Sequence, residues 1–174
     1  MFAAIFFLLI TSLTSCNEDN IQLSTDQDIF FEVSHINYAW GKQFKGFIVE
    51  KDGKIRTYTN PVKWNAANET AGLSLTQVQE NISNTVVSPA SISMDELKTY
   101  TSKINLITGS EFSKPQSGGA DRGITSFYAY RFDLEKQIYI PVLLSQTGDM
   151  ETYNKDKSAI EISAWLSGLL AKVY

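Results

Sequence analysis

The chain has 174 residues, of which 15 are Lys or Arg and 19 are Asp or Glu, and its formal net charge is -4. Acids and bases are interspersed along it, which argues against nucleic acid as a partner, because a nucleic-acid-binding surface needs a basic stripe. With one cysteine and one histidine, the chain has no internal disulfide and no histidine-rich zinc site, and we expect neither a metal nor a cofactor.

The first element is an apolar run at residues 2–10. It is about half of the ~20 residues that a helix needs to cross a bilayer, so it suits the core of a secretory signal rather than a membrane span. The run ends in Leu13-Thr14-Ser15-Cys16, which resembles the bacterial lipobox. This resemblance implies that residues 1–15 are removed as a signal peptide and that Cys16 receives acyl chains such as palmitate.

Lipidation at Cys16 would fix the protein to a membrane, because two or more acyl chains give a lasting anchor. A plain signal peptide with an incidental cysteine is the alternative. Residues 16–27 are mostly polar and are expected to form a flexible tether. Within them, Asn17-Glu18-Asp19-Asn20 resembles the export signal of surface lipoproteins of the Bacteroidota. The resemblance implies an outer-membrane location, with the domain displayed at the cell surface.

Three strands are predicted in the first part of the domain, at residues 29–34, 44–50 and 54–59. In the first of them, Ile29, Phe31 and Val33 are expected to share one face. The second and third are joined by Lys51-Asp52-Gly53, in which the glycine can take the positive φ that a tight hairpin requires. This pattern predicts an antiparallel β-hairpin.

Two helices are predicted next, from the N-terminal capping boxes Ser74/Gln77 and Ser93/Glu96. Residues 109–123 are rich in glycine and polar residues and are expected to form a loop. Strands are predicted at residues 127–134, where apolar and polar side chains alternate, and at 138–144, where Pro141 indicates an edge or a bulge. The chain should close with a helix whose apolar stripe comprises Ile162, Trp165, Leu166, Leu169, Leu170 and Val173.

This order of elements predicts one α+β domain over residues 28–174. Adjacent strands along the chain favour antiparallel pairing, in a sheet of about five strands. About three helices are expected to pack on one face of that sheet.

Two segments, residues 31–53 and 145–166, resemble parts of small, uncharacterised lipoproteins of the Bacteroidota. The stretches that carry this resemblance are His35-Ile36-Asn37-Tyr38-Ala39-Trp40-Gly41 and Gln146-Thr147-Gly148-Asp149. Since such lipoproteins have no settled activity, the resemblance implies a secreted single domain and nothing about its chemistry.

One catalytic reading depends on His35, the sole candidate for a general base at neutral pH. It would make the protein a small envelope hydrolase. A histidine packed on a strand is the competing interpretation, since His35 follows the apolar alternation of the first strand. The carboxylates Asp28, Glu32 and Asp149 show no spacing that identifies a paired acid and base.

Exposed aromatic side chains could instead bind a partner, because they offer large rigid areas at little entropic cost. The candidates are Tyr38, Trp40, Tyr58 and Trp64, although such rings also fill cores. A second candidate lies in the glycine-rich loop, where Asp121 and Arg122 could face a ligand; a simple connector is the alternative.

The sequence therefore favours a membrane-anchored, non-catalytic binding or interaction module of the bacterial envelope. Its ligand would be a protein or a glycan, and one form of the protein case is an immunity or inhibitor lipoprotein. The small hydrolase that uses His35 is the alternative from another class of protein.

Overall fold

The computed structural model describes residues 27–109 and 111–174. The lipobox, Cys16 and nearly all of the expected tether lie outside the described residues. Gln27, the last residue of the expected tether, is described and is only 5% exposed. Its side-chain Nε2 donates hydrogen bonds to the carbonyl oxygens of Ile29 and Tyr130, both at 2.8 Å. The folded domain therefore already includes Gln27.

The described chain forms β1 (Ile29–Asn37), β2 (Gln43–Glu50), β3 (Lys54–Thr59), β4 (Leu73–Ser74), α1 (Leu75–Ser83), β5 (Val86–Ser91), α2 (Met94–Thr101), the short 3-10 helix η1 (Ile104–Leu106), β6 (Gln116–Ser117), β7 (Ile124–Asp133), β8 (Ile138–Gly148), β9 (Met150–Tyr153) and α3 (Lys157–Val173). The α+β class is confirmed.

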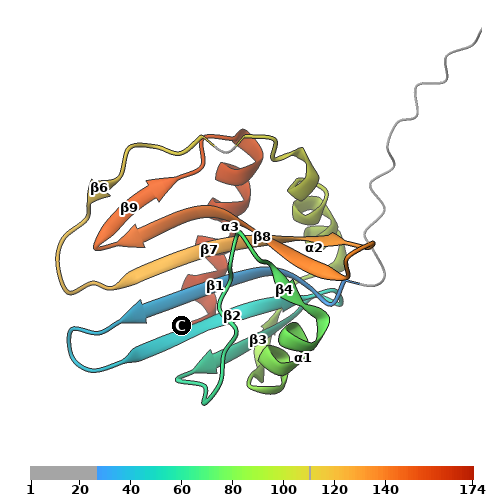
Figure 1. Cartoon of the computed structure of the whole chain (residues 1–174), viewed down its shortest axis with the longest axis horizontal. Helices are drawn as coiled ribbons and strands as arrows, with labels where there is room; N and C mark the ends of the chain where they lie inside the picture. The colour runs from blue at the N-terminus through green and yellow to red at the C-terminus, as the bar shows by residue number, and fades with distance from the viewer. Residues whose placement is uncertain (1–26, 110) are drawn as a thin grey trace, which may run out of the picture.

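The strands form one antiparallel sheet in the order β5-β3-β2-β1-β7-β8-β9-β6, with β4 paired to β8 (Figure 1). This sheet has nine strands rather than the expected five or so. The strands that the sequence does not predict are β5, β9 and the two-residue strands β4 and β6. Of these, β5 contains Pro89 and lies at an edge of the sheet, where proline is tolerated.

Helices cover both faces of the sheet, and the prediction that they share one face is wrong. On one face, α2, η1 and α3 pack on a large apolar cluster that includes Phe31, Val33 and Phe47. On the other face, α1 and the loop before it cover a smaller cluster built around Ile48 and Tyr139. Figure 1 shows α1 in front of the sheet and α3 behind it. The central strands are consequently buried on both sides.

A bulge in β1 explains one further difference from the predicted pattern. The register between β1 and β2 shifts between Ile29 and Phe31, so Ile29 joins the smaller cluster while Phe31 and Val33 stay in the larger one. An extra residue in one strand moves the side chains before it to the opposite face of the sheet.

Only the first of the two predicted capping boxes forms in full. Ser74 and Gln77 form the full reciprocal box at the start of α1. At α2, the Ser93 hydroxyl accepts from the backbone N–H of Glu96, at 3.2 Å. The Glu96 carboxylate instead accepts a hydrogen bond from Trp165 Nε1 at 2.7 Å, which links α2 to α3.

In the part of the chain that the structure describes, no helix combines the length and the apolar character that a membrane span requires.

Candidate functional site

The loop that joins β1 to β2 carries two exposed aromatic rings. Tyr38 is 67% exposed and Trp40 is 82% exposed, although large aromatic side chains normally bury most of their surface. This loop, which we call the hairpin tip (residues 38–42), projects from the left end of the sheet in Figure 1. Rigid aromatic rings that are exposed in this way are typical of sites that bind a partner.

Asn37, the last residue of β1, holds the hairpin tip in place. Its Oδ1 accepts a hydrogen bond from the backbone N–H of Ala39 at 2.8 Å, and its Nδ2 donates to the carbonyl oxygen of Asp121 at 2.9 Å. Such Asx turns order the backbone locally. This role of Asn37 was not predicted from the sequence, where its only signal is an asparagine at the end of a strand, directly before a hairpin tip.

Asp121 and Arg122 lie beside the hairpin tip, because Asn37 bonds to the first of them. The guanidinium of Arg122 is engaged within its own loop, since it donates to the Gly118 carbonyl oxygen and lies 3.5 Å from the Glu151 carboxylate. The backbone N–H of Arg122 donates to Asp149 Oδ1 at 2.8 Å. The structure therefore brings Tyr38, Trp40 and Asp121 to one end of the sheet, with Arg122 supporting the adjacent loop.

Tyr58 and Trp64 do not join this group. They pack against each other, with ring centroids 3.8 Å apart, and both lie near Phe44. Tyr58 is only 2% exposed, and Trp64 packs on the smaller core cluster. Their geometry is that of core aromatics.

Beneath this pair, Glu32 is a buried acid on a central strand. It is 2% exposed and accepts hydrogen bonds from the hydroxyls of Tyr58, at 3.1 Å, and Tyr130. Burial raises the pKa of Glu32, and the hydrogen bonds from Tyr130 and Tyr58 offset this only in part. Burial also raises the pKa of each tyrosine well above its usual value. With all three groups buried, this cluster is part of the core and offers no surface to a ligand.

On the face that α3 partly covers, polar side chains form a line across four neighbouring strands. Thr147, Thr125, His35 and Lys45 are cross-strand partners in that order, and we call them the polar row. Residues two positions further into the sheet, such as Val33 and Phe127, belong to the large core cluster on the same face. The row therefore lies just outside the apolar core.

His35 is half-buried in this row. Its Nδ1 lies 2.9 Å from Thr125 Oγ1, and burial, followed by the charge of Lys45, lowers its pKa. The lowered pKa favours the neutral form of the imidazole. A histidine-based hydrolase also needs a group that orients the base, and in the described part of the chain no carboxylate bonds to this ring.

The three carboxylates considered from the sequence lie apart from one another. Asp28 pairs with Lys51 at 2.9 Å and accepts from Gln79 at 2.6 Å. Glu32 is buried among tyrosines, and Asp149 accepts from the backbone of the loop beside the hairpin tip. The structure brings no two of them together as an acid and a base.

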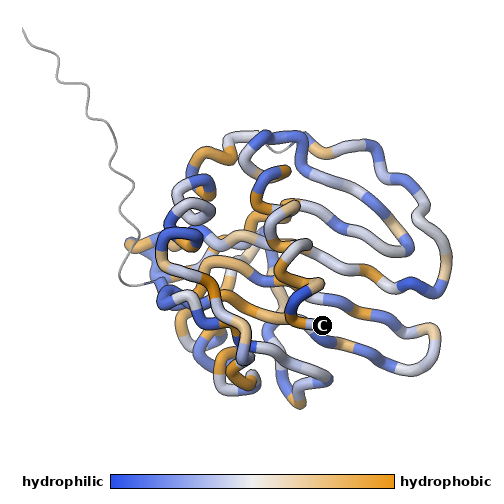
Figure 2. The backbone as a smooth tube through the Cα atoms, turned by 180° about the vertical axis from the view of Figure 1, so that it is seen from behind, coloured by the Kyte–Doolittle hydropathy of each residue, from blue (hydrophilic) through white to orange (hydrophobic). Residues whose placement is uncertain are grey.

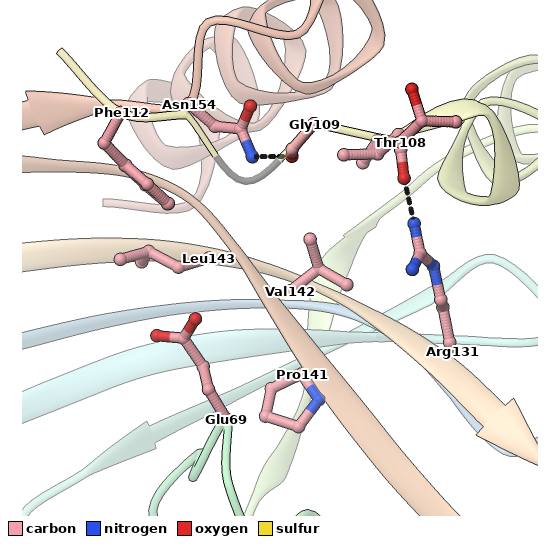
Figure 3. Close-up of a pocket in the computed structure, with 10 residues that line it drawn as sticks. Glu69, Thr108, Gly109, Phe112, Arg131, Pro141, Val142, Leu143 and Asn154 are labelled. Carbon is pink, nitrogen blue, oxygen red and sulfur yellow. Dashed lines mark hydrogen bonds between the residues drawn. The ribbon is translucent and has the colours of Figure 1, made fainter.

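A small pocket of about 210 Å³ lies along β8 (Figure 3). In it, Arg131 donates to the carbonyl oxygens of Ile104, at 3.2 Å, and Ile107. Across the pocket, Asn154 donates to the Gly109 carbonyl oxygen at 3.0 Å. Figure 3 shows these polar groups turned toward the backbone. They secure the loop after η1, so the hairpin tip stays the stronger candidate site.

Within residues 27–109 and 111–174, no three side chains of the metal-binding types come together in a group that could hold an ion. No protein-family model matches this chain, and no curated protein or solved structure is significantly similar to it. The candidate site therefore depends on its own geometry.

Proposed function

We propose that this chain is a lipoprotein of the bacterial outer membrane, anchored through Cys16, that acts without catalysis as a binding module. In this proposal the hairpin tip contacts the partner. The observation that carries it is the exposure of Trp40, 82%, beside Tyr38 on a backbone that Asn37 fixes. A fixed tip loses less conformational entropy when it binds, so more of the contact energy contributes to affinity.

The position of the hairpin tip relative to the anchor supports this proposal. β1 begins at Ile29, at the end of the sheet nearest the expected tether, and runs away from it to Asn37. At about 3.3 Å per residue, a strand of nine residues spans roughly 30 Å. A domain held by Cys16 would thus carry Tyr38 and Trp40 at the end of the sheet far from the anchor.

The shape of the hairpin tip favours a protein as the partner. Tyr38 and Trp40 project from a narrow loop, and a projecting aromatic side chain that enters a pocket of another protein is a common binding hot spot. An immunity or inhibitor lipoprotein is one form of this function. A glycan is the alternative ligand.

Photo-crosslinking tests this proposal. p-Benzoylphenylalanine replaces Trp40 in one variant and Leu134 in the control, and each is irradiated in membranes of the source cells. Leu134 is suited to the control because it is 54% exposed and follows β7 at the opposite end of the sheet. We expect one discrete protein adduct from position 40 and none from position 134.

Competition with unlabelled protein tests whether the adduct at position 40 is specific. Excess unlabelled protein should suppress the adduct, and the Trp40→Ala protein at the same concentration should not. Equal adducts from both positions, or equal suppression by both competitors, would contradict a contact at the hairpin tip. If no protein adduct forms but envelope polysaccharide quenches Trp40 fluorescence, the ligand is a glycan and not a protein.

A further inference from the structure

A groove of about 570 Å³ lies between α3 and the strands β7, β8 and β9. Its volume falls in the range of roughly 300–1,000 Å³ that is usual for sites that bind small molecules. Apolar side chains from both sides line it, among them Phe127 and Leu144 from the sheet and Ile160 and Leu170 from the helix. Figure 2 shows the strands extending well beyond α3 on the face where the groove lies.

Small residues on α3 keep this groove open. Ser163, Ala164 and Ser167 line it at helical spacing, where larger side chains would fill the space between helix and sheet. The Ser163 hydroxyl is already engaged, because its Oγ lies 2.5 Å from Ser145 Oγ. With these hydroxyls bonded to each other, the apolar side chains are the main surface that the groove offers.

One end of the groove meets the polar row. Thr147 belongs to both, and it is the cross-strand partner of Thr125. From the helix side, Leu170 is one turn before Tyr174, whose backbone N–H bonds to the Leu170 carbonyl oxygen. The ammonium group of Lys45 lies 4.8 Å from the centre of the Tyr174 ring. Lys45 therefore lies beside Tyr174, which follows the groove residue Leu170 by one helical turn along α3.

Lys45 and His35 leave polar groups available at this end. Among the described residues, Lys45 forms no ion pair with a carboxylate, and its contact is with the Tyr174 ring. His35 uses Nδ1 for Thr125 and has no described partner at Nε2. When the Thr125 hydroxyl donates to Nδ1, Nε2 carries the proton and can donate to an anion. The site thus offers two donors to a negative group.

We propose that this groove binds an anionic amphiphile with one carboxylate, a fatty acid. Its alkyl chain occupies the groove along α3, and its carboxylate bonds to Lys45 Nζ and His35 Nε2. Charge complementarity selects this ligand, because an ammonium without an acidic partner attracts an anion and repels a cationic amphiphile. The proposal is separate from the hairpin tip, since it uses neither Tyr38 nor Trp40.

Calorimetric titration with dodecanoate, below its critical micelle concentration, tests the proposal on the purified protein. Acetate supplies the carboxylate without the chain, and dodecyltrimethylammonium supplies the chain with the opposite charge. We expect saturable binding of dodecanoate, and for each of the other two probes an affinity at least about tenfold weaker. Amide NMR shifts should move at Lys45, Thr147 and Leu170.

Matched variants separate the two parts of the site. Lys45→Glu should weaken dodecanoate binding at least tenfold and strengthen dodecyltrimethylammonium binding, whereas Lys98→Glu, the same charge change at an exposed position of α2, should alter neither. Ala164→Trp should block the groove, whereas Ala171→Trp, an exposed position of α3 outside the groove, should leave binding unchanged. Thermal unfolding checks that each variant is folded.

Three outcomes would overturn the proposal. The first is an absence of saturable dodecanoate binding, and the second is equal affinity for dodecanoate and dodecyltrimethylammonium. The third is unchanged dodecanoate affinity in folded Lys45→Glu or Ala164→Trp protein. Failure of the crosslink at Trp40 affects none of these measurements, so the two proposals are tested independently.

Discussion

The hydroxyl group of Tyr58 donates a hydrogen bond to the carboxyl group of Glu32 at 3.1 Å, inside the sheet face that α1 covers. The two residues lie on β3 and β1, 26 positions apart in the chain. This contact places an acid and its donor where water does not reach. It ties the stability of the domain to the protonation of one side chain.

Replacing Glu32 with Gln should remove a pH dependence of stability. Because the pKa of Glu32 is raised in the folded state, its contribution is fully present below its unfolded pKa, near 4.5, and is lost as pH rises through its folded pKa. Across that window the free energy of unfolding of the native protein should fall relative to Glu32→Gln, by up to about 1.4 kcal/mol per pH unit.

Urea denaturation of both proteins from pH 4 to pH 9 measures this difference. The contribution of His35, whose lowered pKa acts in the opposite direction, is common to both proteins and cancels. A difference that stays constant with pH would mean that Glu32 has an ordinary pKa in the fold.

Replacement with alanine should affect stability strongly at Trp64 and hardly at all at Trp40. Trp64→Ala removes a ring packed against Tyr58 and should lower the free energy of unfolding by about 2–3 kcal/mol, somewhat less than for a fully buried tryptophan. Trp40→Ala removes an exposed ring and should change it by less than about 0.5 kcal/mol. Chemical denaturation followed by circular dichroism measures both. A large loss in Trp40→Ala would show that the hairpin tip belongs to the core.

Asn37→Ala should loosen the hairpin tip without unfolding the domain. It removes both side-chain hydrogen bonds, to Ala39 and to Asp121, so the Ala39 amide should exchange its hydrogen faster by about tenfold, as expected for a lost hydrogen bond of roughly 1 kcal/mol. Hydrogen exchange followed by NMR checks this. Asn68→Ala is the control, since Asn68 caps a separate turn at Thr70; faster exchange of Ala39 in that variant would contradict the assignment.

The link between α2 and α3 depends on Glu96. Glu96→Ala leaves Trp165 Nε1 without its acceptor, and we expect a loss of about 1–3 kcal/mol. Glu96→Gln keeps an acceptor and should lose less. Equal losses in the two variants, measured by urea denaturation, would show that this hydrogen bond adds nothing to the packing of Trp165 on Tyr100.

Elements with strong periodicity or clear end signals could be predicted from the sequence. The hairpin of β2 and β3, the cap at Ser74 and the apolar stripe of α3 all depend on residues close together in the chain. The strands β5 and β9 could not be predicted, because the first has little alternation and a proline, and the second is four residues long. Both exist because the neighbouring strand supplies their hydrogen bonds.

The apolar cluster under α1 also has a signal in the sequence of β2. Phe47, Ile48 and Val49 are consecutive and all buried, a pattern typical of a strand covered on both faces. At the candidate site, the exposed position of Tyr38 and Trp40 and the buried position of Tyr58 were not distinguishable from composition. That difference depends on the loop before α1, which folds back over Tyr58 and leaves the hairpin tip uncovered.

The intact mass of the protein purified from its own cells tests whether the chain is held at a membrane through Cys16. We predict a chain that begins at Cys16, lacks residues 1–15 and carries the added mass of a diacylglyceryl group. A chain that keeps residues 1–15, or that begins elsewhere and carries no lipid, would rule out an anchor at Cys16.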